Sequence, residues 1–139
     1  MIDKHDHSMH APAHVTVASA PDVARVMAVV MSLRVECRVV SPPGAGCFMG
    51  VEWWQAVVAD CTLPALLDCG LAAGFAGTGL RAGLDGVIVQ APPAQQRALH
   101  ALARVTGGQV LDVRPATFDL PPDGAGEALA RYLRAHRAP

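Results

Sequence analysis

Short apolar runs rich in β-branched residues alternate along this chain with stretches of helical periodicity. The strand candidates are residues 14–19, 35–41, 64–70, 86–91 and 109–115. Helical spacing of apolar residues follows each of them, as in Val23, Val26, Met27 and Val30. Strands that alternate with helices over short connections pair in parallel through right-handed crossovers. The sequence therefore predicts an α/β fold, a three-layer sandwich with a five-stranded, mainly parallel sheet and helices on both faces.

The order of the strands in this sheet is left open by the sequence. A flavodoxin-like order, 2-1-3-4-5, and a Rossmann-like order, 3-2-1-4-5, both accommodate the pattern. The choice matters for two cysteines, because Cys47 follows the second strand and Cys69 ends the third. These strands are neighbours in the second order and are separated in the first. After the fifth strand, residues 118–124 (FDLPPDG) are predicted to be a turn-rich linker, with Asp123 capping a last helix.

At 139 residues the chain fits one domain, which we assign to residues 14–139, preceded by a flexible His-rich tail at 1–13. The net charge is −1, the arginines are scattered and aromatic residues make up 4 %, which argues against nucleic-acid binding. No run reaches the roughly 18–20 apolar residues that span a bilayer. Apolar residues make up 52 % of the chain. We expect them to form a buried sheet and the interface of a homo-oligomer, with a dimer favoured.

The four cysteines have no metal-finger spacing, and the polar N-terminus does not resemble a secretory signal. Reduced thiols and a cytoplasmic location are the resulting expectation.

The loop SPPGAGCFMG, residues 41–50, is the centre of the predicted binding site. In a parallel α/β sheet, the loops after the strands open at the carboxyl edge, where ligands bind. The ligand-binding candidates at this edge are Ser19, Ser41, Gly44, Gly46, Cys47, Asp68, Cys69, Gln90 and Arg114. The loop lacks the lysine of a P-loop and the spacing of a dinucleotide fingerprint, so the sequence identifies no cofactor. It predicts a small-molecule binding or regulatory domain, with Asp68 and Arg114 forming an ion pair at the rim.

Two alternatives remain open, and with them the question whether the protein is an enzyme. Cys47 lies near the N-terminus of a predicted helix, where a thiol is activated as a nucleophile, and Cys69 or Asp68 would assist it. Neither His100 nor His136 has an evident position as its base. The other alternative is metal handling by His5, His7 and His10 in the tail, since dense imidazoles bind copper, nickel or zinc.

Overall fold

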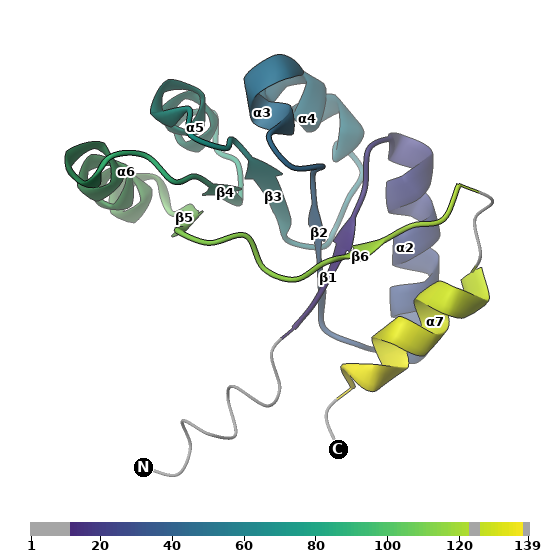
Figure 1. The fold of residues 1–139 in the computed structure, drawn as a ribbon. Helices are drawn as coiled ribbons and strands as arrows, with labels where there is room; N and C mark the ends of the chain where they lie inside the picture. The colour runs from purple at the N-terminus through teal and green to yellow at the C-terminus, as the bar shows by residue number, and fades with distance from the viewer. Residues whose placement is uncertain (1–11, 123–125, 138–139) are drawn as a thin grey trace, which may run out of the picture.

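The computed structural model describes residues 12–122 and 126–137. All pairings in its six-stranded sheet are parallel, in the order β5-β4-β3-β2-β1-β6 (Figure 1). The strands are β1 (Ala13–Thr16), β2 (Cys37–Val40), β3 (Ala65–Asp68), β4 (Gly86–Ile88), β5 (Gln109–Leu111) and β6 (Phe118–Asp119). The helices are α2 (Ala20–Leu33), α3 (Ala45–Phe48), α4 (Val51–Val57), α5 (Ala73–Arg81), α6 (Pro93–Thr106) and α7 (Gly126–Ala135). The predicted α/β fold, with a parallel sheet and helices on both sides, is confirmed, although the sheet has six strands and not five.

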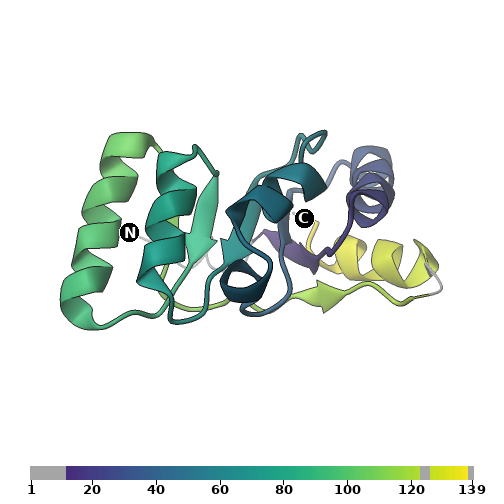
Figure 2. The ribbon, with the colours of Figure 1, turned by 90° about the horizontal axis from the view of Figure 1, so that it is seen from above.

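The strand order differs from both orders considered for the sequence. β3, β2 and β1 are neighbours as in the Rossmann-like order, but β4 and β5 continue outward from β3. Each of the first four crossovers therefore moves the chain by one strand in the same direction. Because parallel crossovers are right-handed, α2, α4, α5 and α6 lie side by side on one face, as Figure 2 shows. Only the last strand is added on the other side: β6 pairs in parallel with the free edge of β1.

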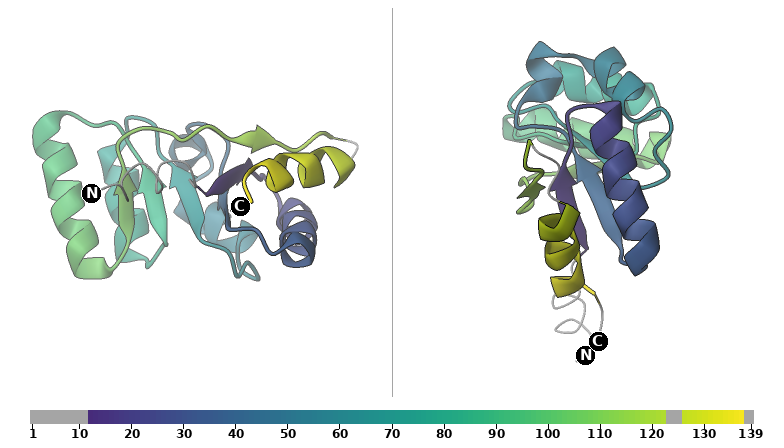
Figure 3. Two further views of the ribbon diagram at one scale, coloured as in Figure 1. Left: turned by 90° about the horizontal axis from the view of Figure 1, so that it is seen from below. Right: turned by 90° about the vertical axis from the view of Figure 1, so that its right-hand side faces the viewer.

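The other face of the sheet is crossed by residues 112–117, which link β5 to β6 (Figure 3). Val40, Leu66 and Ile88 form a small buried cluster on this face, with Leu111 packed against it. β6 itself lies in the segment predicted to be a turn-rich linker, so that prediction is wrong for residues 118 and 119. Its two residues become a strand only through pairing with Val15 and Thr16 of β1, which local sequence does not encode. Asp123, the predicted cap, lies outside the described residues.

The core lies mainly between the sheet and the helix layer. Alternate strand residues point into it, and Val15, Val39, Leu67 and Val87 are all fully buried. α7 packs against α2 at the end of the sheet formed by β1 and β6 (Figure 3). There the Tyr132 hydroxyl accepts from the His14 N–H (3.0 Å) and donates to its carbonyl (3.1 Å). Within the described ranges, no helix has the length and apolar character needed to cross a membrane.

Candidate functional site

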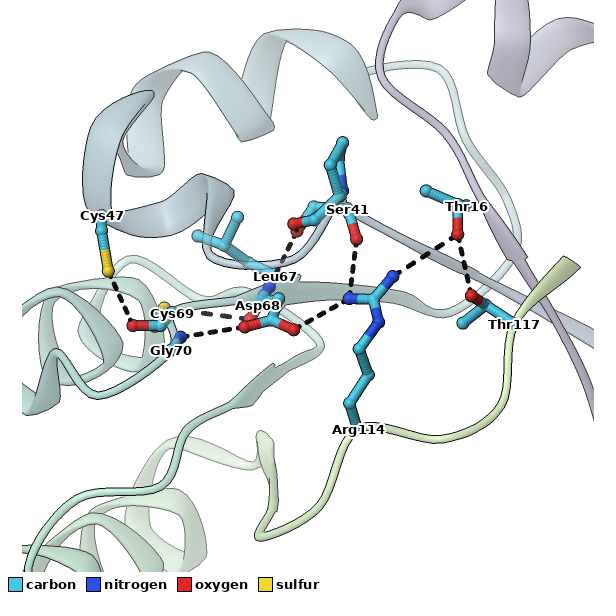
Figure 4. A network of polar contacts seen from close by, with 10 residues as sticks. Thr16, Ser41, Cys47, Leu67, Asp68, Cys69, Gly70, Arg114 and Thr117 are labelled. Carbon is cyan, nitrogen blue, oxygen red and sulfur yellow. Dashed lines mark hydrogen bonds and ion pairs between the residues drawn. The ribbon is translucent and has the colours of Figure 1, made fainter. Parts of the chain in front are cut away.

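The carboxyl edge of the sheet brings together residues that are far apart in the sequence, as Figure 4 shows. Because all strands are parallel, the loops after β1, β2, β3 and β4 leave the sheet at this same edge. Ser41 directly follows β2, Asp68 ends β3, and Arg114 reaches the edge from the crossing segment 112–117. The convergence predicted for these three residues is therefore present.

Asp68 and Arg114 form the expected ion pair, with 2.8 Å between Arg114 Nη1 and Asp68 Oδ2. The pair is more enclosed than a surface salt bridge, since the exposed fractions of the two side chains are 8 % for Asp68 and 22 % for Arg114. Arg114 Nη1 also donates to the Ser41 carbonyl (3.0 Å), and Nη2 donates to Thr16 Oγ1 (3.4 Å). One guanidinium thus ties the crossing segment to the ends of β1, β2 and β3.

Ser41 and Gly70 complete the polar network around Asp68. The Ser41 hydroxyl accepts from the Asp68 N–H (2.9 Å) and donates to the Pro42 carbonyl (3.1 Å). Asp68 Oδ1 accepts from the Gly70 N–H (2.9 Å). Gly70 has φ +57°, a conformation that favours glycine, and this sharp turn directs the chain away from the end of β3.

The glycines of the 41–50 loop let the short helix α3 sit directly on the end of β3. A Cβ on Gly46 would lie 2.8 Å from Cys69 Sγ and 3.1 Å from the Asp68 carbonyl oxygen, so any side chain there would force these neighbours to shift. Cys47 is exposed, and its thiol donates to the Cys69 carbonyl (2.9 Å), whereas Cys69 is fully buried. Gly44, Gly46, Cys47 and Cys69 therefore do lie together, with Cys47 presented to solvent.

Thiol catalysis at Cys47 would need a base. The imidazoles of His100 and His136 both make contacts with other residues. His100 Nε2 lies 2.7 Å from Asp112 Oδ1, which also accepts from Gln96 (2.7 Å). The hydrogen bonds from Gln96 and His100 lower the pKa of Asp112. His136 Nδ1 lies 3.1 Å from the Tyr132 carbonyl oxygen.

Ser19 and Gln90 lie at the same edge but take no part in the network around Asp68. The Ser19 hydroxyl accepts from the Asp22 N–H (3.2 Å) and caps the first turn of α2. Gln90 is exposed, and its N–H donates to the Gly70 carbonyl (2.8 Å), which places it beside the turn after β3.

Sequence reasoning missed Thr16, Thr117 and a group of exposed apolar side chains. Thr16 Oγ1 donates to Thr117 Oγ1 (3.0 Å), so a short polar chain continues from Arg114 to the crossing segment. The apolar group comprises Phe48, Met49, Leu71 and Phe75, whose exposed fractions run from 44 % to 74 %. The sequence held a signal for this group, because large apolar residues stand next to the glycines of the loops 41–50 and 70–75.

The proposed metal ligands His5, His7 and His10 lie outside the described residues. Among the residues that are described, no three His, Cys, Asp or Glu side chains gather as a potential metal site. His14, the first residue after the assigned tail, is buried on β1, and its Nε2 has no partner within the described part of the chain. Burial and the nearby Arg38 charge lower the pKa of His14.

Comparisons with protein-family models, with curated proteins and with solved structures found no match to this chain. The functional interpretation therefore depends on the geometry of the site.

Proposed function

We propose that the protein is a binding or regulatory module for a small anionic molecule that carries an apolar group. Its binding surface consists of the loops 41–50 and 70–75 at the carboxyl edge, together with Arg114. The observation that carries this proposal is the convergence of a partly exposed guanidinium, glycine-lined loops and exposed apolar side chains at one edge of a parallel sheet.

Arg114 supplies the polar recognition in this proposal. A guanidinium has five N–H groups, and the hydrogen bonds of Arg114 to Ser41, Asp68 and Thr16 use three of them. The remaining donors suit a carboxylate or phosphate oxygen, because guanidinium groups bind such anions through paired hydrogen bonds. The bonds already formed hold the guanidinium in place, so a ligand does not have to order it.

The exposed apolar group, Phe48, Met49, Leu71 and Phe75, supplies the second element of recognition. These side chains come from α3, the turn after β3 and the first turns of α5, so they flank Cys47 and Gly70. Contact with an apolar ligand group would remove part of their surface from water, which stabilises by about 25 cal/mol per Å².

A concave surface elsewhere on the protein competes with this site. An apolar groove of about 570 Å³ runs between α2 and α4, lined by Met27, Met31, Ala56 and Val57 among others. Asp60 is the charged residue of its lining. The groove lacks the converging polar groups that fix the orientation of a small ligand, so we favour the carboxyl edge.

A thermal-shift titration with octyl phosphate, octanoate, octanol and inorganic phosphate tests the proposal. The two amphipathic anions should raise the Tm most, because only they engage both Arg114 and the apolar group. A ligand at a hundred times its Kd adds about 2.7 kcal/mol to the free energy of unfolding. If none of the four probes raises the Tm, the proposed ligand class is wrong.

Two surface variants locate the effect. Phe48→Ser should weaken the stabilisation without unfolding the protein, because Phe48 is 71 % exposed. Val105→Ser is the matched control, since Val105 on α6 is 84 % exposed and lies away from the loops. Equal stabilisation of both variants would place the ligand elsewhere.

The predicted homo-oligomer and cytoplasmic location also remain proposals. Exposed Met31 and the groove between α2 and α4 support a dimer, because contiguous apolar surface is typical of subunit interfaces. Light scattering coupled to size exclusion should give twice the chain mass, and Met31→Glu should reduce it. The proposed cytoplasmic location rests on the four free cysteines, because reduced thiols are typical of a reducing compartment.

A further inference from the structure

Two cysteines that are 22 residues apart, Cys47 and Cys69, meet at the carboxyl edge of the sheet. β2 and β3 are neighbours, with Val40 paired to Leu66, so the loops that follow them leave side by side. Cys69 directly follows β3, and Cys47 lies in α3, which packs against the end of that strand. The strand order therefore brings these two thiols together.

The contact between the two cysteines is close. The Cys47 thiol donates to the Cys69 carbonyl oxygen at 2.9 Å (Figure 4). Since a carbonyl oxygen lies about 2.4 Å from its own Cα, Cys47 Sγ is at most about 5 Å from Cys69 Cα. Cys69 Sγ in turn occupies the space beside Gly46, the residue that precedes Cys47. A disulfide forms between cysteines whose Cα atoms lie about 4.4–6.8 Å apart, and in this pair rotation of the two side chains would bring the Sγ atoms together.

The two thiols differ in their access to solvent. Cys47 is exposed, so a dissolved oxidant reaches it directly. Cys69 is fully buried, and burial, with further contributions from Cys47 and Asp68, raises its pKa to about 12. Cys69 is thus kept as a protected thiol next to an accessible one, an arrangement typical of an attacked and a resolving cysteine.

We propose that Cys47 and Cys69 form a reversible redox site at which a hydroperoxide converts the two thiols to an intramolecular disulfide. Cys47 lies within the proposed binding loop 41–50, but the redox reaction does not require the proposed ligand. In the first step an oxygen atom passes from the peroxide to Cys47 Sγ. The S–O bond forms, the O–O bond breaks, and the departing alkoxide or hydroxide takes the proton of the Cys47 thiol to leave as an alcohol or water. Cys47 is then a sulfenic acid, and the peroxide has been reduced by two electrons.

In the second step Cys69 Sγ attacks Cys47 Sγ. The S–S bond forms, the S–O bond breaks, and the hydroxyl group leaves with the Cys69 proton as water. The close contact of the pair offsets the poor nucleophilicity of a buried thiol, because an intramolecular partner has a high effective concentration. Two equivalents of a small thiol reverse the reaction by exchange. The disulfide fixes α3 to the end of β3 and removes the exposed thiol from the edge.

Oxidation of the reduced full-length chain with one equivalent of hydrogen peroxide tests this proposal. The free thiols, counted after denaturation, should fall from four to two, and the intact mass should fall by about 2 Da, the mass of the two hydrogens lost. Trypsin together with a protease that cleaves before Asp60 and Asp68 places Cys47, Cys61 and Cys69 in separate peptides. The peptides that carry Cys47 and Cys69 should be linked until a reductant is added.

Single-cysteine variants assign the two roles. Cys69→Ala should stop at the Cys47 sulfenic acid, which dimedone traps, while Cys47→Ser should retain its three thiols under the same treatment. Cys61→Ser is the matched control and should still form the disulfide. A wild-type protein that keeps four thiols, gains only oxygen, or links Cys47 to a residue other than Cys69 would overturn the proposal.

Discussion

Replacing Arg114 with Met is expected to destabilise the protein by about 2–3 kcal/mol. Removing one partner of a buried ion pair costs about 3–5 kcal/mol, because the remaining charge is left without compensation. The expected loss lies at or below the lower end of that range, since Arg114 is 22 % exposed and water can reach part of the vacated space. The carboxylate of Asp68, at 8 % exposure, would keep its hydrogen bond from the Gly70 N–H but lose its ion pair. The crossing segment would lose its bond to Ser41 and keep the Thr117 bond to Thr16.

Urea unfolding followed by tryptophan fluorescence measures this loss, because Trp54 is fully buried. In a domain of this size each 1 kcal/mol corresponds to about 3–4 °C in Tm, so the expected decrease is about 6–12 °C. Asp68→Asn keeps the acceptor for Gly70 and should cost about 1–2 kcal/mol. The double variant should show a coupling of at least about 1 kcal/mol.

Arg97→Met is the matched control, since Arg97 is an exposed residue of α6. It should change the free energy of unfolding by no more than about 0.5 kcal/mol. If Arg114→Met costs no more than this control, the guanidinium does not hold the edge together, and the role assigned to it is wrong.

Three further perturbations have defined outcomes. Tyr132→Phe removes the hydroxyl that bonds both the N–H and the carbonyl of His14, and should cost about 1–3 kcal/mol in urea unfolding; no loss would mean that water replaces the hydroxyl. Gly46→Ala should destabilise by about 1–3 kcal/mol because its Cβ would meet Cys69 Sγ at 2.8 Å. Gly74→Ala has open space around its Cβ and should stabilise by up to about 1 kcal/mol. Similar effects of the two substitutions would contradict the close packing of α3 on the end of β3. Because the pKa of His14 is lowered from 6.5, the unfolded chain takes up its proton first as the pH falls, so stability should decline from about pH 6.5 toward pH 5, and His14→Gln should reduce that decline.

The elements with strong local signals were predicted correctly from the sequence. β4 lies in the apolar run 86–91, and α6 begins at Pro93 and ends before Gly107, as proline and glycine at the two ends of a helix predict. β6 was not predicted, because its two residues become a strand only by pairing with β1. The strand order was not predicted either. A crossover helix of a given length can place the next strand on either side of the preceding one, so the sequence of helices and strands does not determine the order.

The candidate site was predicted in outline from the parallel topology. Because the loops after parallel strands leave the sheet at one edge, the convergence of Ser41, Asp68 and Arg114 and the ion pair between Asp68 and Arg114 were predicted. The sequence did not reveal that residues 112–117 cross the second face of the sheet. For that reason the bonds from Arg114 to Ser41 and Thr16, and the low exposure of Asp68, were not foreseen.

A ¹H–¹⁵N correlation titration with the most stabilising anion of the four probes tests the binding site most directly. We predict shifts confined to the amides of residues 41–50 and 70–75 and to the Arg114 Nε–H, all saturating with one affinity. Shifts centred on Met27, Met31 and Ala56 would place the ligand in the groove between α2 and α4, and would contradict a binding site at the carboxyl edge.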